Sequence, residues 1–376
     1  MLHRNKKREA TPIENQKRIP RLCIASWIAT GVCGLLVLLF RLFPAFADFF
    51  NRYISQPLRL VFGLITSIFP FSLAEMMLIL SPVLLTLLIV LGVRKHAKTW
   101  KSAGMYLCKI FSAVLVFFIL FVSNFAAGYY GVPLNDETKL DLDRQNSSAE
   151  ELYQTALHLA EQVNREAMNV TFKEKDFSIM PYRRSEMNRH LLDAYDTFCE
   201  EHDFIGHFYS RAKPVLLSEA MSYTHITGVY SYFTGEANLN VNFPDYTLPY
   251  TAAHELAHQR GIAREDEANF MAFLVCTASE DPYFRYCGYL NLYEYVASAL
   301  YSADSERYFA VLDTVDYRMR GELIAYSEFF DQYRENVVSE VSGAINDTYL
   351  KLQGTEGSKS YGRVVDLAVA WYKALK

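Results

Sequence analysis

Histidine and cysteine are scarce in this sequence, and their positions argue against several kinds of site. The 376 residues include 9 histidines and 6 cysteines, and no histidine follows His258. No two cysteines have the C-x-x-C spacing of a cysteine zinc site. No G-x-x-x-x-G-K segment is present to cradle a phosphate. The second half holds only Cys199, Cys276 and Cys287, which form at most one disulfide or stay as buried free thiols.

Acidic residues are nearly missing from the first third of the chain. Residues 1–130 contain 15 Lys and Arg and 4 Asp and Glu, whereas residues 131–376 contain 22 and 38. The net charge of −5 therefore combines a basic, apolar part with an acidic part whose net charge is −16. The acidic part is long enough to form its own core. Its charge argues against a nucleic-acid partner.

Three long apolar runs predict transmembrane helices at about 22–40, 73–93 and 103–127. Residues 41–72, between the first two runs, are rich in Phe and contain three prolines. Their longest charge-free stretch is too short to cross a bilayer as a helix. We interpret this segment as an interfacial or re-entrant helix. The alternative is a fourth crossing, which would move everything downstream to the other side of the membrane.

Basic residues gather in two segments that a three-span arrangement places on the same side. These segments are the tail 1–21 and the loop 94–101. The positive-inside rule puts that side in the cytoplasm. We therefore expect a multi-pass protein of the cytoplasmic membrane, with the bilayer as a partner. Its membrane anchor is expected at 22–130 and its extracytoplasmic domain at 131–376.

The acidic part is predicted to be mainly α-helical with a small β-sheet. Residues 221–233 and 235–243 predict a hairpin around Gly235, because β-favouring residues and period-two alternation flank it. The edge of a hairpin offers backbone groups to an extended peptide. Asn238 and Asn240 are therefore candidates for contacts with substrate, and a solvent-facing role is the alternative. Helical patterns cover 147–168, 185–201, 204–213, 283–301, 304–315, 318–352 and 361–375.

The segment 251–270 contains the pattern H-E-x-x-H. On a helix, His254 and His258 lie on one face, so that their imidazoles can bind one ion. Glu255 follows the first histidine and is close enough to take a proton from water bound to that ion. Two histidines do not complete the site, because catalytic zinc takes a third protein ligand and leaves its fourth position to water.

The third ligand is expected in the helix that follows. Gly261 is typical of a helix end, and a second helical pattern starts near residue 263. Its acidic first turn contains Glu265 and Glu267, and the turn suits a helix N-terminus. A histidine six residues beyond His258 would indicate a metzincin, but Arg264 occupies that position. Both glutamates remain candidates, because the register of a short turn cannot be read from sequence.

The run Glu265-x-x-Ala268-Asn269 resembles the third-ligand helix of gluzincin metallopeptidases. This resemblance implies that Glu265 binds zinc and that Asn269 orients His254. The sequence departs from the family pattern at two points. Asn stands where the family more often has Asp, and the spacer between His258 and Glu265 is shorter than in thermolysin-like enzymes.

A wider similarity includes residues 235–240. The chain is similar, over most of its length, to an uncharacterised bacterial family of membrane-anchored proteins with zinc-peptidase features. The two resemblances imply an α+β zincin-like domain that follows three transmembrane helices. They imply Zn²⁺ as cofactor and a peptide or protein as substrate, but they identify no particular substrate.

We therefore expect a membrane-anchored zinc metallopeptidase that acts outside the cytoplasmic membrane. Glu255 is expected to serve as general base and then as proton donor. The alternative is a catalytically silent metal-binding sensor or scaffold of the cell envelope. The sequence does not single out a group that stabilises the oxyanion. The candidates are tyrosines on the later helices, together with His225, Tyr317, Arg318 and Arg320.

Overall fold

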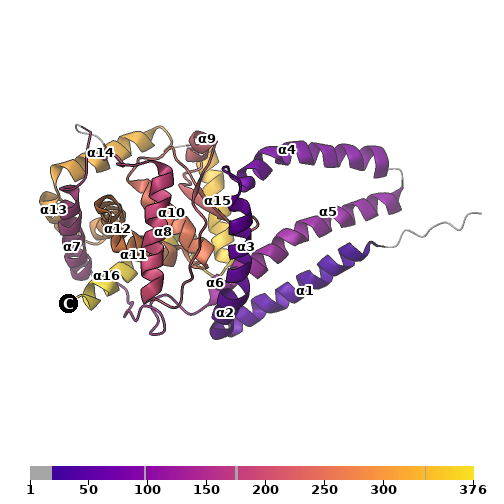
Figure 1. Ribbon diagram of the computed structural model, residues 1–376, viewed down its shortest axis with the longest axis horizontal. Coiled ribbons are helices and arrows are strands. Elements are labelled where there is room, and N and C mark those ends of the chain that lie inside the picture. The colour runs from indigo at the N-terminus through magenta and orange to yellow at the C-terminus, as the bar shows by residue number, and fades with distance from the viewer. Residues whose placement is uncertain (1–18, 97–98, 174–176, 335) are drawn as a thin grey trace, which may run out of the picture.

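Three helices project from one side of a mainly helical body (Figure 1). The computed structural model describes residues 19–96, 99–173, 177–334 and 336–376, so nearly all of the predicted basic tail lies outside the described residues. By length and composition the three helices can cross a membrane, which agrees with the predicted spans. They are α1 (Arg21–Leu42), α4 (Leu73–Leu91, extended by a π-helical turn to His96) and α5 (Trp100–Phe121, extended through a second π-helical turn to α6, Ala127–Tyr130).

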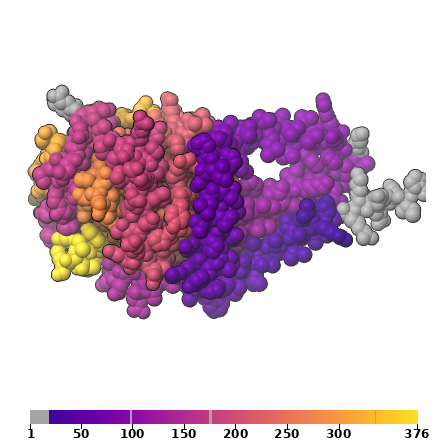
Figure 2. Space-filling view, viewed as in Figure 1, coloured from indigo at the N-terminus to yellow at the C-terminus, as the bar shows by residue number. Residues whose placement is uncertain are grey.

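A helical segment that we call the strap, residues 44–67, lies between these helices and the body (Figures 1 and 2). Its polar residues Ser55 and Arg59 face inward and are fully buried, whereas Leu58 and Val61 on its outer side are exposed. An apolar outer side is typical of a helix at a membrane surface, and the interfacial position of residues 41–72 stays a prediction. The strap comprises α2 (Pro44–Phe50), a π-helical turn (Asn51–Ser55) and α3 (Gln56–Ser67).

A buried ion pair fixes the start of α4 to the body. Glu236 accepts hydrogen bonds from the backbone N–H groups of Leu73 and Ala74, at 3.0 and 2.9 Å. Lys213 Nζ lies 2.6 Å from the Glu236 carboxylate and 2.6 Å from the carbonyl oxygen of Thr66. Several hydrogen bonds therefore surround both buried charges, which is the condition for burying an ion pair without a large penalty. These bonds join the membrane-proximal segments to the sheet.

The body contains a three-stranded sheet in the order β1-β3-β2. Strands β2 (Gly228–Ser231) and β3 (Glu236–Leu239) form the predicted antiparallel hairpin. Gly235 in its turn has a φ of +70°, which a residue without a Cβ adopts readily. Strand β1 (Lys213–Pro214) pairs in parallel with β3 and was not predicted. Strand β2 is therefore at an edge of the sheet.

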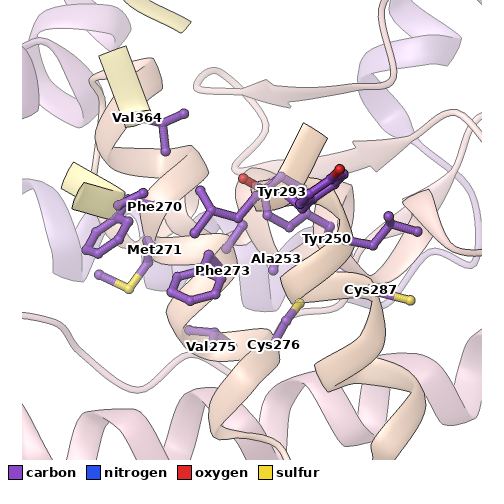
Figure 3. Close-up of a cluster of buried hydrophobic side chains, with 14 of the residues drawn as sticks. Tyr250, Ala253, Phe270, Met271, Phe273, Val275, Cys276, Cys287, Tyr293 and Val364 are labelled. Atoms are coloured by element: carbon purple, nitrogen blue, oxygen red, sulfur yellow. The ribbon is translucent and has the colours of Figure 1, made fainter. Parts of the chain in front are cut away.

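Helix α11 lies in the centre of the body's core (Figure 3). Its residues Phe270, Met271 and Phe273 are fully buried and pack among Tyr250 of α10 and Cys287 of α12. Cys199, Cys276 and Cys287 are buried free thiols. The helices of the body are α7 (Ala149–Ala167), α8 (Arg184–Glu201), α9 (Ser218–Ser222), α10 (Thr247–Arg260), α11 (Glu265–Ala278), α12 (Pro282–Ala303), α13 (Ser305–Thr314), α14 (Tyr317–Asp331), α15 (Val337–Leu352), the 3-10 helix η4 (Gly357–Arg363) and α16 (Val364–Ala374).

The mainly α fold with a small sheet is confirmed, but two predicted helices are wrong. Residues 204–213 contain no helix. The side chain of Asn188 instead bonds both backbone groups of Ala212, which removes the need for helical partners. The predicted helix 318–352 is divided into α14 and α15. Asn336 caps the start of α15 with its side chain, and this favours a break at that point.

We predict that Gly128→Ala destabilises the fold. A Cβ at this position in α6 would lie 2.5 Å from the carbonyl oxygen of Gly261 and 2.9 Å from Ala263 Cβ, so α6 and the loop after α10 would be forced apart. We expect a loss of about 1–3 kcal/mol and a lower thermal midpoint for the full-length chain in detergent, measured by circular dichroism. Gly104→Ala is the control, because a Cβ there meets nothing within 4 Å. Equal midpoints for the two variants would contradict the prediction.

Candidate metal centre

Helix α10 carries the two histidines and is buried along its whole length. It ends at Gly261, which has a φ of +100° in the left-handed region, as the sequence predicts. The backbone N–H of Ile262 then bonds to the carbonyl oxygen of Ala257 at 3.1 Å and closes the helix end. Only a short loop separates this end from Glu265, the first residue of α11.

The structure brings His254, His258 and Glu265 together. Glu265 Oε2 lies 3.2 Å from His254 Nε2 and 3.4 Å from His258 Nε2. The three ligand atoms lie within 4.8 Å of one another, and all three residues are buried. Burial opposes ionisation of His258, but the adjacent Glu265 carboxylate outweighs it and raises the His258 pKa to about 9. Two imidazoles and one carboxylate in this arrangement can hold a divalent metal ion.

A hydrogen bond to the second ring nitrogen of a histidine fixes the orientation of its ring, and the two histidines differ in this bond. His258 Nδ1 lies 2.7 Å from the carbonyl oxygen of Ile262, so the carbonyl fixes the ring and leaves Nε2 for a ligand bond. His254 Nδ1 and Asn269 Nδ2 are both buried without a hydrogen-bond partner among the described residues. The two side chains line the same cavity. The pairing of Asn269 with His254 that the resemblance implies therefore stays a prediction.

Glu267 is placed elsewhere. Its Oε1 atom accepts hydrogen bonds from the backbone N–H of Leu134 at 2.9 Å and from Arg264 Nη1 at 2.8 Å. The carboxylate is thus neutralised by Arg264 and holds the segment that follows α6. The group of residues that could hold a metal ion contains Glu265 and does not contain Glu267. The structure therefore favours Glu265 as the third ligand.

The strap and the end of α6 hold the loop between α10 and α11. Asn51 of the strap donates from its side chain to the carbonyl oxygen of Gly261 at 3.1 Å. Arg59 donates to the last carbonyl of α10, on Arg260, at 3.4 Å. Arg264 in turn donates to the carbonyl oxygen of Tyr129 at 3.2 Å. The carbonyls at a helix C-terminus need such partners. The role of Arg59 in binding the end of α10 was not predicted from the sequence. A charged residue in an apolar segment is a signal that could have indicated a buried partner.

Glu255 lies against the edge strand β2. A Cβ on Gly228 would be 2.6 Å from Glu255 Oε1, so only glycine at this position leaves room for the carboxylate. The Tyr230 backbone N–H donates to the carboxylate, and Oε2 is buried without a partner among the described residues. Burial raises the Glu255 pKa to about 6, despite the opposing effect of the two histidines. A carboxyl group with this pKa can accept a proton near neutral pH.

These groups open into a cavity of about 600 Å³. Residues from β2, α10, α11, α12, α14, α15 and η4 line it, and His254, Glu255 and Asn269 are among them. The backbone N–H and C=O groups of Gly228 point away from β3, because the neighbouring residues Thr227 and Val229 supply the ladder bonds. One side of the cavity therefore carries the outward-facing backbone groups of Gly228, for which no partner is found among the described residues.

Asn238 and Asn240 do not reach this cavity. Both are almost fully buried on β3 and just beyond it. The Asn238 amide donates to the carbonyl oxygens of Val229 and Glu236. The Asn240 amide donates to Ser222 Oγ and to the Ile226 carbonyl oxygen. The structure thus gives both residues hydrogen bonds that hold the hairpin, and neither residue lines the cavity.

The structure places some of the candidates for oxyanion stabilisation in the cavity and others away from it. His225 lines the cavity, although its Nε2 lies 2.6 Å from the Tyr333 carbonyl oxygen. Tyrosines of the later helices also line it, among them Tyr295 and Tyr361. Burial and the nearby carboxylates, including Glu265, raise the pKa of Tyr295 to about 12, so its phenol stays protonated and can donate. By contrast, Tyr317 is 79% exposed, Arg318 is paired with Asp316, and Arg320 is bonded to the carbonyl oxygen of Val315.

A second carboxyl group in the cavity was missed by sequence reasoning. Glu294 of α12 lines the cavity, and Tyr246 donates to its Oε1 at 3.0 Å. Burial raises the Glu294 pKa to about 7, the Tyr246 hydrogen bond lowers it, and the Glu322 charge adds to the rise. No local motif marks this residue, because its role depends on how α12 packs against α10.

We predict that His258→Ala and Glu265→Ala lose bound metal while Glu267→Gln retains it. The first two changes remove atoms that lie within 4.8 Å of the other ligand atoms. The third changes a side chain that bonds to Leu134 and Arg264 instead. The measurement is metal content per full-length chain by mass spectrometry. Retention by the Glu265 variant, with loss from the Glu267 variant, would show that the ligand has been assigned wrongly.

We predict that Glu294→Gln stabilises the protein more at alkaline pH than at acidic pH. The folded-state pKa of about 7 lies above the ordinary value of 4.5, so ionisation of Glu294 destabilises the native state as pH rises through this interval. From about pH 5 to about pH 8 the variant should gain up to about 3 kcal/mol relative to wild type. Thermal midpoints of the full-length chain at both pH values measure this gain. Glu219→Gln on the surface of α9 is the control, and an equal difference at both pH values would refute the prediction.

Comparison with known proteins matches this chain to one protein family. A family model described as "Protein of unknown function (DUF3810)" matches residues 46–369. No curated protein and no solved structure matches the chain. The matched region begins within α2, so it includes most of the strap together with His254, Glu255, His258 and Glu265. The strap and the metal-binding group therefore belong to one family unit.

Proposed function

The chain belongs to the DUF3810 family, and we propose that it is a membrane-anchored zinc-dependent metallopeptidase. The observation that carries the proposal is the convergence of His254 Nε2, His258 Nε2 and Glu265 Oε2 within 4.8 Å. Glu255 faces the same cavity, and one of its carboxylate oxygens has no hydrogen-bond partner among the described residues. A structural metal site does not need a base beside its ligands.

The residues fit a catalytic zinc ion. Two histidines and one carboxylate are a donor set found in catalytic zinc sites, and three protein ligands leave one position for water. When bound, zinc lowers the pKa of that water and polarises the carbonyl of the scissile bond. The Ile262 carbonyl supports the site by holding the His258 ring through its Nδ1 atom.

Glu255 supplies the proton transfer. Its carboxylate accepts the proton from the attacking water, and the carboxylic acid then gives the proton to the departing amine. The pKa of about 6 leaves the group mostly ionised at neutral pH while keeping it a useful acid. The phenols of Tyr295 and Tyr361 line the same cavity and are donors for the developing oxyanion.

The edge of β2 supports a peptide as the substrate. An extended chain can pair with the unpaired backbone groups of Gly228 and thereby lie next to Glu255. Such backbone pairing does not depend on the side chains of the substrate. The cavity of about 600 Å³ then accommodates side chains near the scissile bond.

The charge distribution supports an extracytoplasmic location for the body. Arg94, Lys95 and Lys101 lie at the ends of α4 and α5 that point away from the body (Figure 1). By the positive-inside rule these ends face the cytoplasm, as does the basic tail that precedes α1. The three helices then make the protein multi-pass and leave the metal-binding group outside the cytoplasmic membrane.

We predict that Glu255→Gln keeps its metal and its thermal midpoint but cleaves peptides about 100- to 10,000-fold more slowly, because the general base is lost. The assay uses full-length, zinc-loaded protein in detergent with a synthetic peptide library, and products are identified by mass spectrometry. Glu219→Gln, on the surface of α9, is the matched control and should cleave as fast as wild type.

Two results would count against the proposal. A metal-loaded Glu255→Gln variant that cleaves at the wild-type rate would remove Glu255 from the mechanism. A wild-type protein that binds zinc but cleaves no peptide of the library would favour the alternative of a catalytically silent sensor or scaffold in the cell envelope.

A further inference from the structure

Helix α15 has three sides of different character. Its residues Ser339, Ser342, Gly343 and Asn346 line the metal cavity. By helical periodicity its charged residues fall on a second side. A third side is apolar and exposed, and we call it the outer face. The outer face consists of Val337, Val338, Val341, Ile345 and Leu352, which are 53–73% exposed.

The outer face borders an apolar groove of about 600 Å³. The groove is lined by α15 together with Ile226, and it has almost no polar surface among its lining residues apart from Ser342 and Asn346. Ile226, Ser342 and Asn346 line both the groove and the metal cavity. The two spaces therefore adjoin along α15.

The end of α15 is attached where the candidate spans enter the body. Tyr349, which lines the groove, places its ring 6.1 Å from the ring of Phe121 in α5, and its hydroxyl bonds to that of Tyr129 at 3.2 Å. Arg41, in the last turn of α1, donates to the Leu352 carbonyl oxygen at 3.2 Å. Figure 1 shows α15 at the end of the body from which the spans project. The C-terminal end of the outer face therefore lies beside the point where α1 and α5 join the body.

We propose that the outer face of α15 lies in the lipid bilayer surface, so that the metal cavity opens beside the membrane. A contiguous apolar face of this kind is rarely left in water, and a helix with one apolar and one charged side is suited to the boundary between headgroups and acyl chains. The exposed Leu58 and Val61 of the strap give a second apolar surface on the same side of the body. The lipid bilayer is the occupant because the outer face ends beside α1 and α5, at the point where these candidate spans join the body. This inference does not depend on peptidase activity.

The test compares neighbouring positions on one helix. Val341→Cys and Ile345→Cys in the full-length chain are labelled with an environment-sensitive fluorophore and reconstituted into vesicles of phosphatidylcholine and phosphatidylglycerol. Some of the phosphatidylcholine carries a quenching doxyl group. Glu340→Cys on the charged side is the matched control, and wild type labelled in parallel corrects for the native cysteines. We expect the lipid quencher to reduce emission at the outer face at least about twofold more than at the control position.

Two outcomes would overturn the proposal. Equal lipid quenching at residues 340, 341 and 345, with equal quenching by aqueous iodide, would place the outer face in water. Protection of Val341→Cys and Ile345→Cys from both quenchers would show that protein covers the face, such as a second copy of the chain. Thermal midpoints of the labelled variants confirm that each one is folded, and exposed positions on α15 are suited to this substitution.

Discussion

The loop between the two ligand helices is the constraint on which the proposed site depends. His258 and Glu265 come from different helices, so their separation is set by the few residues that join them. Hydrogen bonds from Asn51, Arg59 and Arg264 fix this loop to the strap and to the end of α6. A site held in this way is pre-organised by the membrane-proximal part of the chain. The boundary at residue 131 that the sequence predicts, between the anchor and the acidic domain, therefore cuts through a part of the protein that packs together.

The ion pair of Lys213 and Glu236 makes the same connection from the other side of the hairpin. It binds the start of α4 to β3, while β3 pairs with β2. Strand β2 in turn lies against Glu255 at Gly228 and bonds to its carboxylate through the Tyr230 backbone N–H. A displacement of α4 would thus be passed to the proposed general base through two strands. The sheet is small, but it connects the membrane helices to the centre of the site.

Sequence patterns predict those features of the site that depend on residues close together in the chain. The spacing of His254 and His258 and the end of α10 at Gly261 follow from helix geometry, which involves residues close in sequence. The choice between Glu265 and Glu267 as third ligand depends on the contacts of each side chain. Glu267 is bonded to a segment that precedes α7 and lies far from it in sequence. The role of Glu294 and the irregular path of 204–213 also depend on distant contacts. The fold class and the spans are predictable because composition and periodicity determine them.

The distribution of charge gives an independent argument for a cation at the proposed site. None of the described residues that line the cavity is Lys or Arg, although Glu255 and Glu294 both face it. The buried basic residues nearby are bound elsewhere: Arg264 pairs with Glu267, and Lys213 pairs with Glu236. Buried carboxylates without a positive partner are unfavourable. Among the described residues, the basic partners of Glu265 are the two histidines, and a bound metal ion would take over their charge-balancing role at the proposed site.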